Sequence, residues 1–154
     1  MDSTTLLLAT QINLALNPPR FRGSFLAATA LTTGANLAYS TISEDNYTGW
    51  NSSGHYWTVP ISALYLVNAQ CKWGSTTPST APGLKVFGGA SNTTAELISP
   101  NAGGTGAFLG IGLTGFVRAN AGDQISVQIL NAGFTTQSDA PADNNYLEIW
   151  MISL

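Results

Sequence analysis

The sequence predicts an all-β domain, arranged either as a sandwich or as a barrel. Short runs of β-branched and aromatic residues recur roughly every ten residues, and clusters of Gly, Pro, Asn, Asp and Ser separate them. The chain has 154 residues, of which 44% are hydrophobic, so it can bury one sizeable core. We therefore expect a single domain of about eight or more strands with almost no helix.

The strands are located by the alternation of apolar and polar residues. The most strand-like segment is 61–73, where the residues of one parity from Ala63 to Trp73 are all apolar or aromatic. Turn formers predict a long loop at 43–54 and another at 74–83, and a polar connection at 89–106. The remaining strands are expected at residues 21–31, 36–42, 55–59, 84–88, 107–119, 125–130 and 146–154.

The last predicted strand, 146–154, has two apolar faces. One face consists of Leu147, Ile149 and Met151, and the other of Tyr146, Trp150 and Ile152. A strand with one face in water alternates more cleanly than this. We therefore expect the second face to be covered by something outside the protomer.

Residues 1–19 are expected to form an attachment arm, and residues 20–154 the domain. The apolar side chains of the arm fit neither a helical stripe nor strict alternation; they are Leu6, Leu7, Leu8, Ile12, Leu14 and Leu16. Pro18 and Pro19 end the arm, because a proline pair continues neither a helix nor a central strand. Asp2 stands where a secretory signal carries Lys or Arg, and no apolar run approaches the roughly 18 residues of a membrane span. Neither a signal peptide nor membrane insertion is expected.

The chain is poor in charge. Charged residues make up 8% of it, against roughly 25% in an average globular domain. A monomer stays soluble largely through interspersed charges, so part of this surface is expected to be covered in an assembly, with a neutral polar monomer as the alternative. The five basic residues are scattered, and nucleic-acid binding, which needs clustered Lys and Arg, is not expected.

Catalytic chemistry is not expected. His55 is the sole histidine and Cys71 the sole cysteine, and they lie far apart in the sequence inside strand-like runs. This composition does not favour a nucleophile–histidine pair or an ordinary zinc site. The stretch GIGLTG at 110–115 matches a dinucleotide-binding pattern, but a strand rather than a helix follows it. We predict a protein that is not an enzyme and that uses no cofactor.

Two weaker binding candidates lie in predicted loops or directly beside them. Asp139 and Asp143 are a possible calcium site, to which Glu44 and Asp45 could add ligands at a protomer contact; a plain solvated turn is the favoured alternative. A second candidate is a surface platform for a sugar or a protein among the rings of Trp50, His55, Tyr56 and Trp57, with Trp50 and Tyr56 as the expected surface contacts. Core filling is the alternative for these aromatic rings, and one of Tyr56 and Trp57 is expected to point into the core.

The order of motifs from residue 20 to residue 154 resembles the superfamily that contains tumour necrosis factor and the globular head of complement. TGWNSSGHYWTVPISALYLVNAQC is similar to the family's turn, aromatic, proline corner and Gly-Leu-Tyr strand, although Ala63 stands where the family has Gly. VRANAGDQISVQI resembles the Gly-Asp segment that opens the penultimate core strand. YLEIWMISL occupies the closing strand, with Trp150 where the family often has a Phe-Ser-Gly run.

The resemblance implies a jelly-roll sandwich of two five-stranded antiparallel sheets. It also implies a compact homotrimer with the closing strand near the threefold axis, and binding rather than catalysis. Taken with this resemblance, the low charge and the apolar arm suggest two functions. The first is a non-catalytic bacteriophage virion protein, a capsid decoration (cement) protein on the capsid surface, which binds the major capsid protein or another virion protein through its arm and trimer base. The second is a receptor-binding or adhesin head, from a fibre tip or a secreted ligand, that recognises a host-surface glycan or protein.

Overall fold

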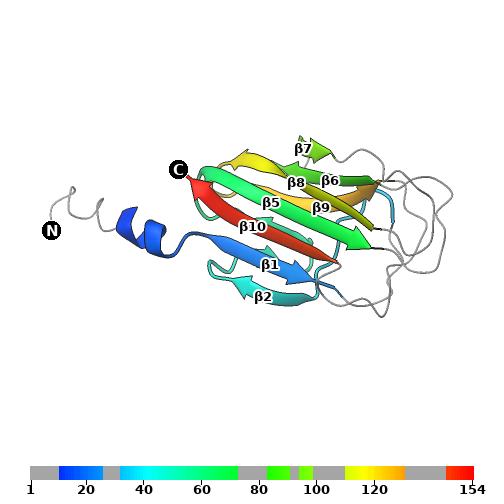
Figure 1. Cartoon of the computed structure of the whole chain (residues 1–154), viewed down its shortest axis with the longest axis horizontal. Coiled ribbons are helices and arrows are strands. Elements are labelled where there is room, and N and C mark those ends of the chain that lie inside the picture. Colours follow the sequence, from blue (N-terminus) through cyan, green and yellow to red (C-terminus); the bar gives the residue numbers. More distant parts are fainter. Residues whose placement is uncertain (1–10, 26–31, 73–82, 91–93, 99–109, 131–144) are drawn as a thin grey trace.

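The computed structural model describes residues 11–25, 32–72, 83–90, 94–98, 110–130 and 145–154, and these form two stacked five-stranded sheets (Figure 1). In spatial order, the first sheet contains β2 (Thr41–Asp45), β1 (Arg20–Ser24), β10 (Tyr146–Ser153), β5 (Ala63–Lys72) and β8 (Gly110–Ala119). The second contains β3 (Trp50–Asn51), β4 (Tyr56–Thr58), β9 (Gln124–Leu130), β6 (Gly83–Gly88) and β7 (Thr94–Ile98). All the strand pairs are antiparallel. The predicted jelly-roll sandwich is confirmed, and the barrel alternative is wrong.

The alternation of apolar and polar residues predicted the positions of the central strands well and those of the edge strands poorly. In β5 every second residue from Ala63 to Cys71 is buried, as predicted. The strand predicted at 36–42 is wrong, because β2 starts at Thr41 and runs to Asp45, inside the predicted loop. Leu37 and Tyr39 are buried and produced the alternating pattern, yet Asn36 forms only an isolated bridge to β9. The strand β7 was missed because it is short, pairs with β6 alone and carries no alternation.

The arm contains a short helix at residues 11–16, where the sequence pattern predicts a partly ordered arm without a clean helical stripe. The helix lies outside the sandwich, at the end of the molecule where the C terminus also lies (Figure 1). Leu14 is half-buried, whereas Ile12 is 51% and Leu16 79% exposed. Leu6, Leu7 and Leu8 lie outside the described residues. Among those that are described, no helix is long and apolar enough to cross a bilayer.

Aromatic rings fill the core between the two sheets. Phe21 stacks on Trp50 at a centroid distance of 5.0 Å, and Trp57 meets Tyr65 edge to face at 5.7 Å. Trp57 is fully buried and Tyr56 is half-buried, which confirms that one of this pair belongs to the core. Such pairs add roughly 0.5–1.5 kcal/mol each beyond their buried area.

Asp45 at the end of β2 connects the two sheets. Its Oδ1 accepts hydrogen bonds from the Gly49 backbone N at 3.0 Å and from Trp57 Nε1 at 3.1 Å, and its Oδ2 accepts one from the Trp50 backbone N at 2.9 Å. Gly49 is required there for space, since a Cβ would lie 2.5 Å from the Thr58 carbonyl oxygen. The carboxylate therefore fixes both tryptophans relative to the first sheet.

Cys71 lies at the end of β5 in the core. Burial raises the pKa of its thiol to about 12, so the thiol stays protonated at neutral pH. Burial also raises the pKa of the nearby Tyr39 hydroxyl well above its usual value, and that hydroxyl has no hydrogen-bond partner within the described part of the chain.

Replacing Asp45 by Ala should lower the free energy of unfolding by about 2–3 kcal/mol, because three N–H donors lose a charged acceptor. Denaturant unfolding followed by tryptophan fluorescence measures this loss. Glu44→Ala is the matched control on the same strand: it removes an exposed ion pair to Arg20 and should cost less than about 1 kcal/mol. Equal losses in the two variants would contradict the role of Asp45.

Cys71 should resist a water-soluble thiol reagent such as an aromatic disulfide at pH 8, since a buried thiol of raised pKa supplies almost no thiolate. The same protein unfolded in denaturant should react stoichiometrically. The release of the chromophore measures both rates. Rapid labelling of the folded protein would show that the thiol is accessible and that the packing described here is wrong.

Candidate functional site

The outward face of the first sheet carries a row of large side chains that crosses four strands. Strand register aligns Arg20 of β1, Trp150 of β10, Leu66 of β5 and Phe116 of β8. Trp150 is 43% exposed and Phe116 60% exposed. Leu147 and Ile149, the inward neighbours on β10, are fully buried. We call Trp150, Leu66 and Phe116 the apolar row.

A polar row runs parallel to it, offset from it by two residues in each strand. It aligns Arg22, Glu148, Asn68 and Thr114. Arg22 Nε lies 3.3 Å from Glu148 Oε1, and Asn68 Nδ2 donates to Glu148 Oε2 at 3.0 Å. The Thr114 hydroxyl donates to Asn68 Oδ1 at 2.9 Å. The outward face of β10 is therefore mixed, because Glu148 separates the apolar positions that the sequence grouped together.

The other two predicted interface residues flank these rows. Tyr146 is half-buried, and its hydroxyl accepts a long hydrogen bond of 3.4 Å from Asn68 Nδ2. Ile152 is 50% exposed and lies where the register between β10 and β5 shifts. All three predicted residues avoid the core, whereas Phe116 was missed. Phe116 alternates along the strand with Val117 and Ala119, and this alternation could have shown that its side chain points outward.

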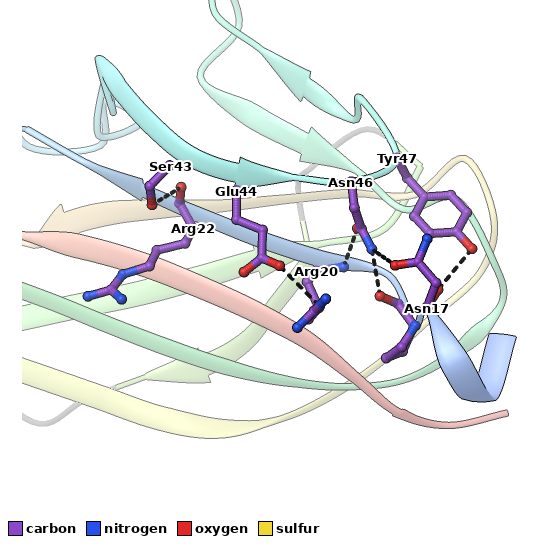
Figure 2. Close-up of polar contacts among 8 residues, drawn as sticks. Asn17, Arg20, Arg22, Ser43, Glu44, Asn46 and Tyr47 are labelled. Carbon is purple, nitrogen blue, oxygen red and sulfur yellow. Dashed lines mark hydrogen bonds and ion pairs between the residues drawn. The ribbon is translucent and has the colours of Figure 1, made fainter. Parts of the chain in front are cut away.

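The root of the arm is held by the loop after β2 (Figure 2). Asn46 Nδ2 donates to Asn17 Oδ1 at 2.9 Å and to the Pro18 carbonyl oxygen at 2.8 Å, and its Oδ1 accepts from the Arg20 backbone N at 2.8 Å. The Tyr47 hydroxyl donates to the Asn17 carbonyl oxygen at 3.2 Å. The position from which the arm leaves the domain is thus defined at Asn17, next to the end of β10.

A pocket of about 260 Å³ opens beside β3. It is lined by Ala38, Tyr39, Ser40, Ile42, Trp50, Ser52 and His55. Trp50, one of the two predicted platform residues, thus lines a pocket. Tyr56 is not among the lining residues; its hydroxyl accepts a hydrogen bond from Asn51 Nδ2 at 2.9 Å.

The remaining candidates supply no evidence of catalytic or metal chemistry. Cys71 is buried and protonated, while His55 lines the pocket at the surface. GIGLTG forms part of β8, paired along its length with β5, and opens no helix.

The predicted additional calcium ligands both have partners within the chain: Glu44 is paired with Arg20, and the Asp45 carboxylate accepts three hydrogen bonds. Asp139 and Asp143 lie outside the described residues, and among the residues that are described no group of three or more potential metal ligands gathers.

Comparisons with known proteins support the fold. The sequence matches no protein-family model and no curated protein. Among solved structures, the chain resembles the globular domain of zebrafish complement 1qA protein, with a TM-score of 0.61, 12% identity and coverage of 88% of this chain and 97% of that one. Eiger TNF from S. frugiperda has a TM-score of 0.64 at 11% identity, covering 88% and 91%. Murine APRIL has a TM-score of 0.62 at 16% identity, covering 87% and 98%. The chain therefore has the jelly-roll fold of tumour necrosis factor and the complement globular head.

Proposed function

We propose that this protein is a non-catalytic head that assembles as a homotrimer through the outward face of the β2-β1-β10-β5-β8 sheet. The apolar row carries the proposal, because Trp150 and Phe116 are large side chains left in water on the regular part of a sheet. Large exposed apolar patches mark association surfaces. The low charge of the chain and the trimer implied by the family resemblance point the same way.

The polar row can determine the register in which two copies of the chain meet on this surface. Its members are already hydrogen-bonded to one another within one protomer. They can be covered at a smaller desolvation cost than unpaired groups, since satisfied polar groups tolerate burial. A second copy in the wrong register would place its own apolar row on charged Arg22 and Glu148, which is unfavourable.

The finer function that we propose is decoration of a virion capsid. The trimer base would lie on the shell, and the arm of residues 1–19 would bind the major capsid protein or another virion protein. Ile12 and Leu16 support this, since both are exposed on a helix that lies outside the sandwich. The Asn17–Asn46 contacts support it further, because they anchor the root of the arm and leave its helix exposed (Figure 2).

A receptor-binding or adhesin head is the second candidate. The pocket beside β3 favours it, because it combines an aromatic ring with hydroxyl and imidazole groups at the surface. Electron microscopy of native particles separates the two candidates: positions on the shell lattice support decoration, and a position at a fibre tip supports receptor binding.

Light scattering at micromolar concentration should give about three times the 16.1 kDa of one chain. Trp150→Glu and Phe116→Glu should each shift the protein to monomer, because an unpaired charge buried at an interface costs several kcal/mol. Thr94→Glu is the control, exposed on β7 at the edge of the other sheet, and should remain a trimer. A wild-type monomer, or a Trp150→Glu trimer, would contradict the proposed interface.

Deleting residues 1–16 should leave a folded trimer that no longer binds its virion, since the deletion removes the helix but keeps the Asn17 contacts. Co-sedimentation with stripped particles measures binding, and circular dichroism measures folding. Retained binding would place the attachment site on the domain and favour the receptor-binding head. Unfolding would show that the arm belongs to the core and that residue 20 is not the domain boundary.

A further inference from the structure

One wall of the pocket beside β3 is a loop that hydrogen bonds within the chain hold in place. Asn51 Oδ1 accepts hydrogen bonds from the backbone N of Ser53 at 3.1 Å and of Gly54 at 2.8 Å. The His55 backbone N donates to the Asn51 carbonyl oxygen at 2.8 Å, and Asn36 Nδ2 donates to the Gly54 carbonyl oxygen at 2.9 Å. These contacts fix the β3–β4 loop, so the pocket is preorganised.

His55 occupies a backbone position that favours glycine. Its φ is 54°, in the left-handed region where a side chain is strained. Gly54 precedes it and is required for another reason, since a Cβ there would lie 2.2 Å from the Tyr56 ring. The chain therefore places an imidazole where glycine fits best. Strain of this kind concentrates at functional sites.

The imidazole does not hold the loop in this conformation through a hydrogen bond of its own. Its ring makes no hydrogen bond within the described part of the chain, and the loop is held by backbone groups and Asn51. What the side chain does is line the pocket, together with Trp50 and Ser52. This position is explained if the imidazole contacts a ligand.

The lining specifies the chemistry of that ligand. The lining residues that the structure describes include no carboxylate, Lys or Arg, so this part of the pocket suits a neutral molecule. Trp50 is held by Phe21 stacked at 5.0 Å and Tyr39 edge-on at 5.9 Å, which fixes the orientation of its indole. Ser40, Ser52 and His55 add hydroxyl and imidazole groups that donate or accept hydrogen bonds. At about 260 Å³ the pocket lies just below the roughly 300–1,000 Å³ of drug-sized sites.

We infer that this pocket binds one ring of a neutral carbohydrate, with the sugar's apolar C–H face against Trp50 and its hydroxyls hydrogen-bonded by Ser52 and His55. A rigid aromatic surface beside several uncharged hydrogen-bonding groups matches a molecule that has an apolar face and a polar rim. The inference deepens the receptor-binding candidate and rests on it. It is independent of the trimer and of the arm.

Saturation-transfer NMR on the full chain tests this with glucose, galactose, mannose, fucose and N-acetylglucosamine, and with N-acetylneuraminic acid as the charged comparison. At least one neutral sugar should bind, and the acid should not. His55→Gly should weaken that binding roughly tenfold, the effect of losing one hydrogen bond. It should also raise the melting temperature by about 2–4 °C, because glycine relieves the strained φ. Ser52→Ala should weaken binding as well.

Thr48→Gly is the matched control. Thr48 also has a left-handed backbone, with φ 53°, but it does not line the pocket. This variant should gain stability like His55→Gly and keep full sugar binding. Absence of binding by every neutral sugar, or binding unchanged in His55→Gly, would overturn the inference. Attachment to host cells that survives His55→Gly would overturn it too, while leaving the receptor-binding function standing.

Discussion

The strand β10 lies between β1 and β5, and its pairing with both determines which side chains enter the core and which reach the surface. This pairing joins the last segment of the chain to the first strand of the domain. Because side chains alternate along a strand, this register sends Leu147 and Ile149 into the core and Glu148 and Trp150 outward. A slip of one residue would exchange the two sets and bury a carboxylate. The core and the proposed assembly surface are therefore specified together.

The same strand also positions the arm. The Met151 backbone N donates to the Pro19 carbonyl oxygen at 3.0 Å, so the chain enters β1 next to the end of β10. Asn46, from the loop after β2, completes the anchor from the other side. The arm helix and the exposed end of β10 consequently lie at one end of the sandwich (Figure 1). A partner bound through the arm would meet the protein at that end.

The pattern of apolar residues predicted the strands in which burial imposes a regular period, and it misled in segments whose apolar residues belong to no ladder or face no core. The alternation in β5 predicted its buried face, and the two-faced pattern of β10 predicted an outward face rich in large side chains. The start of β2 was wrong because Leu37 and Tyr39 are buried in a segment that forms no ladder. The helix at 11–16 was missed because its apolar residues face no core and therefore show no stripe.

The candidate sites show the same contrast: residues on regular strands were predictable, and a pocket built from irregular segments was not. Trp150 and Ile152 were predicted as outward from parity alone, and their exposure agrees. The pocket was not predictable, because its walls come from the irregular segment at Ala38–Ser40, from β2, from β3 and from a loop whose shape depends on Asn51. The aromatic composition of the segment indicated Trp50 and Tyr56 equally as residues of a binding surface. Only the hairpin geometry separates them, by placing Trp50 in the wall and the Tyr56 hydroxyl on Asn51.

The strand β2 links the two proposed surfaces. Glu44 pairs with Arg20 at the end of the apolar row, whereas its neighbour Asp45 binds the backbone of Trp50 in the pocket wall. Successive side chains of a strand point to opposite faces, so one short segment contacts both surfaces without joining them.

The register of β2 on β1 shifts between Arg22 and Gly23, where a Cβ at Gly23 would lie 2.8 Å from the Phe21 ring. The outward ion pair and the inward carboxylate are therefore set by the same bulged pairing. An assembly that held β1 and β2 rigid would also hold Trp50 in place, through its backbone hydrogen bond to Asp45.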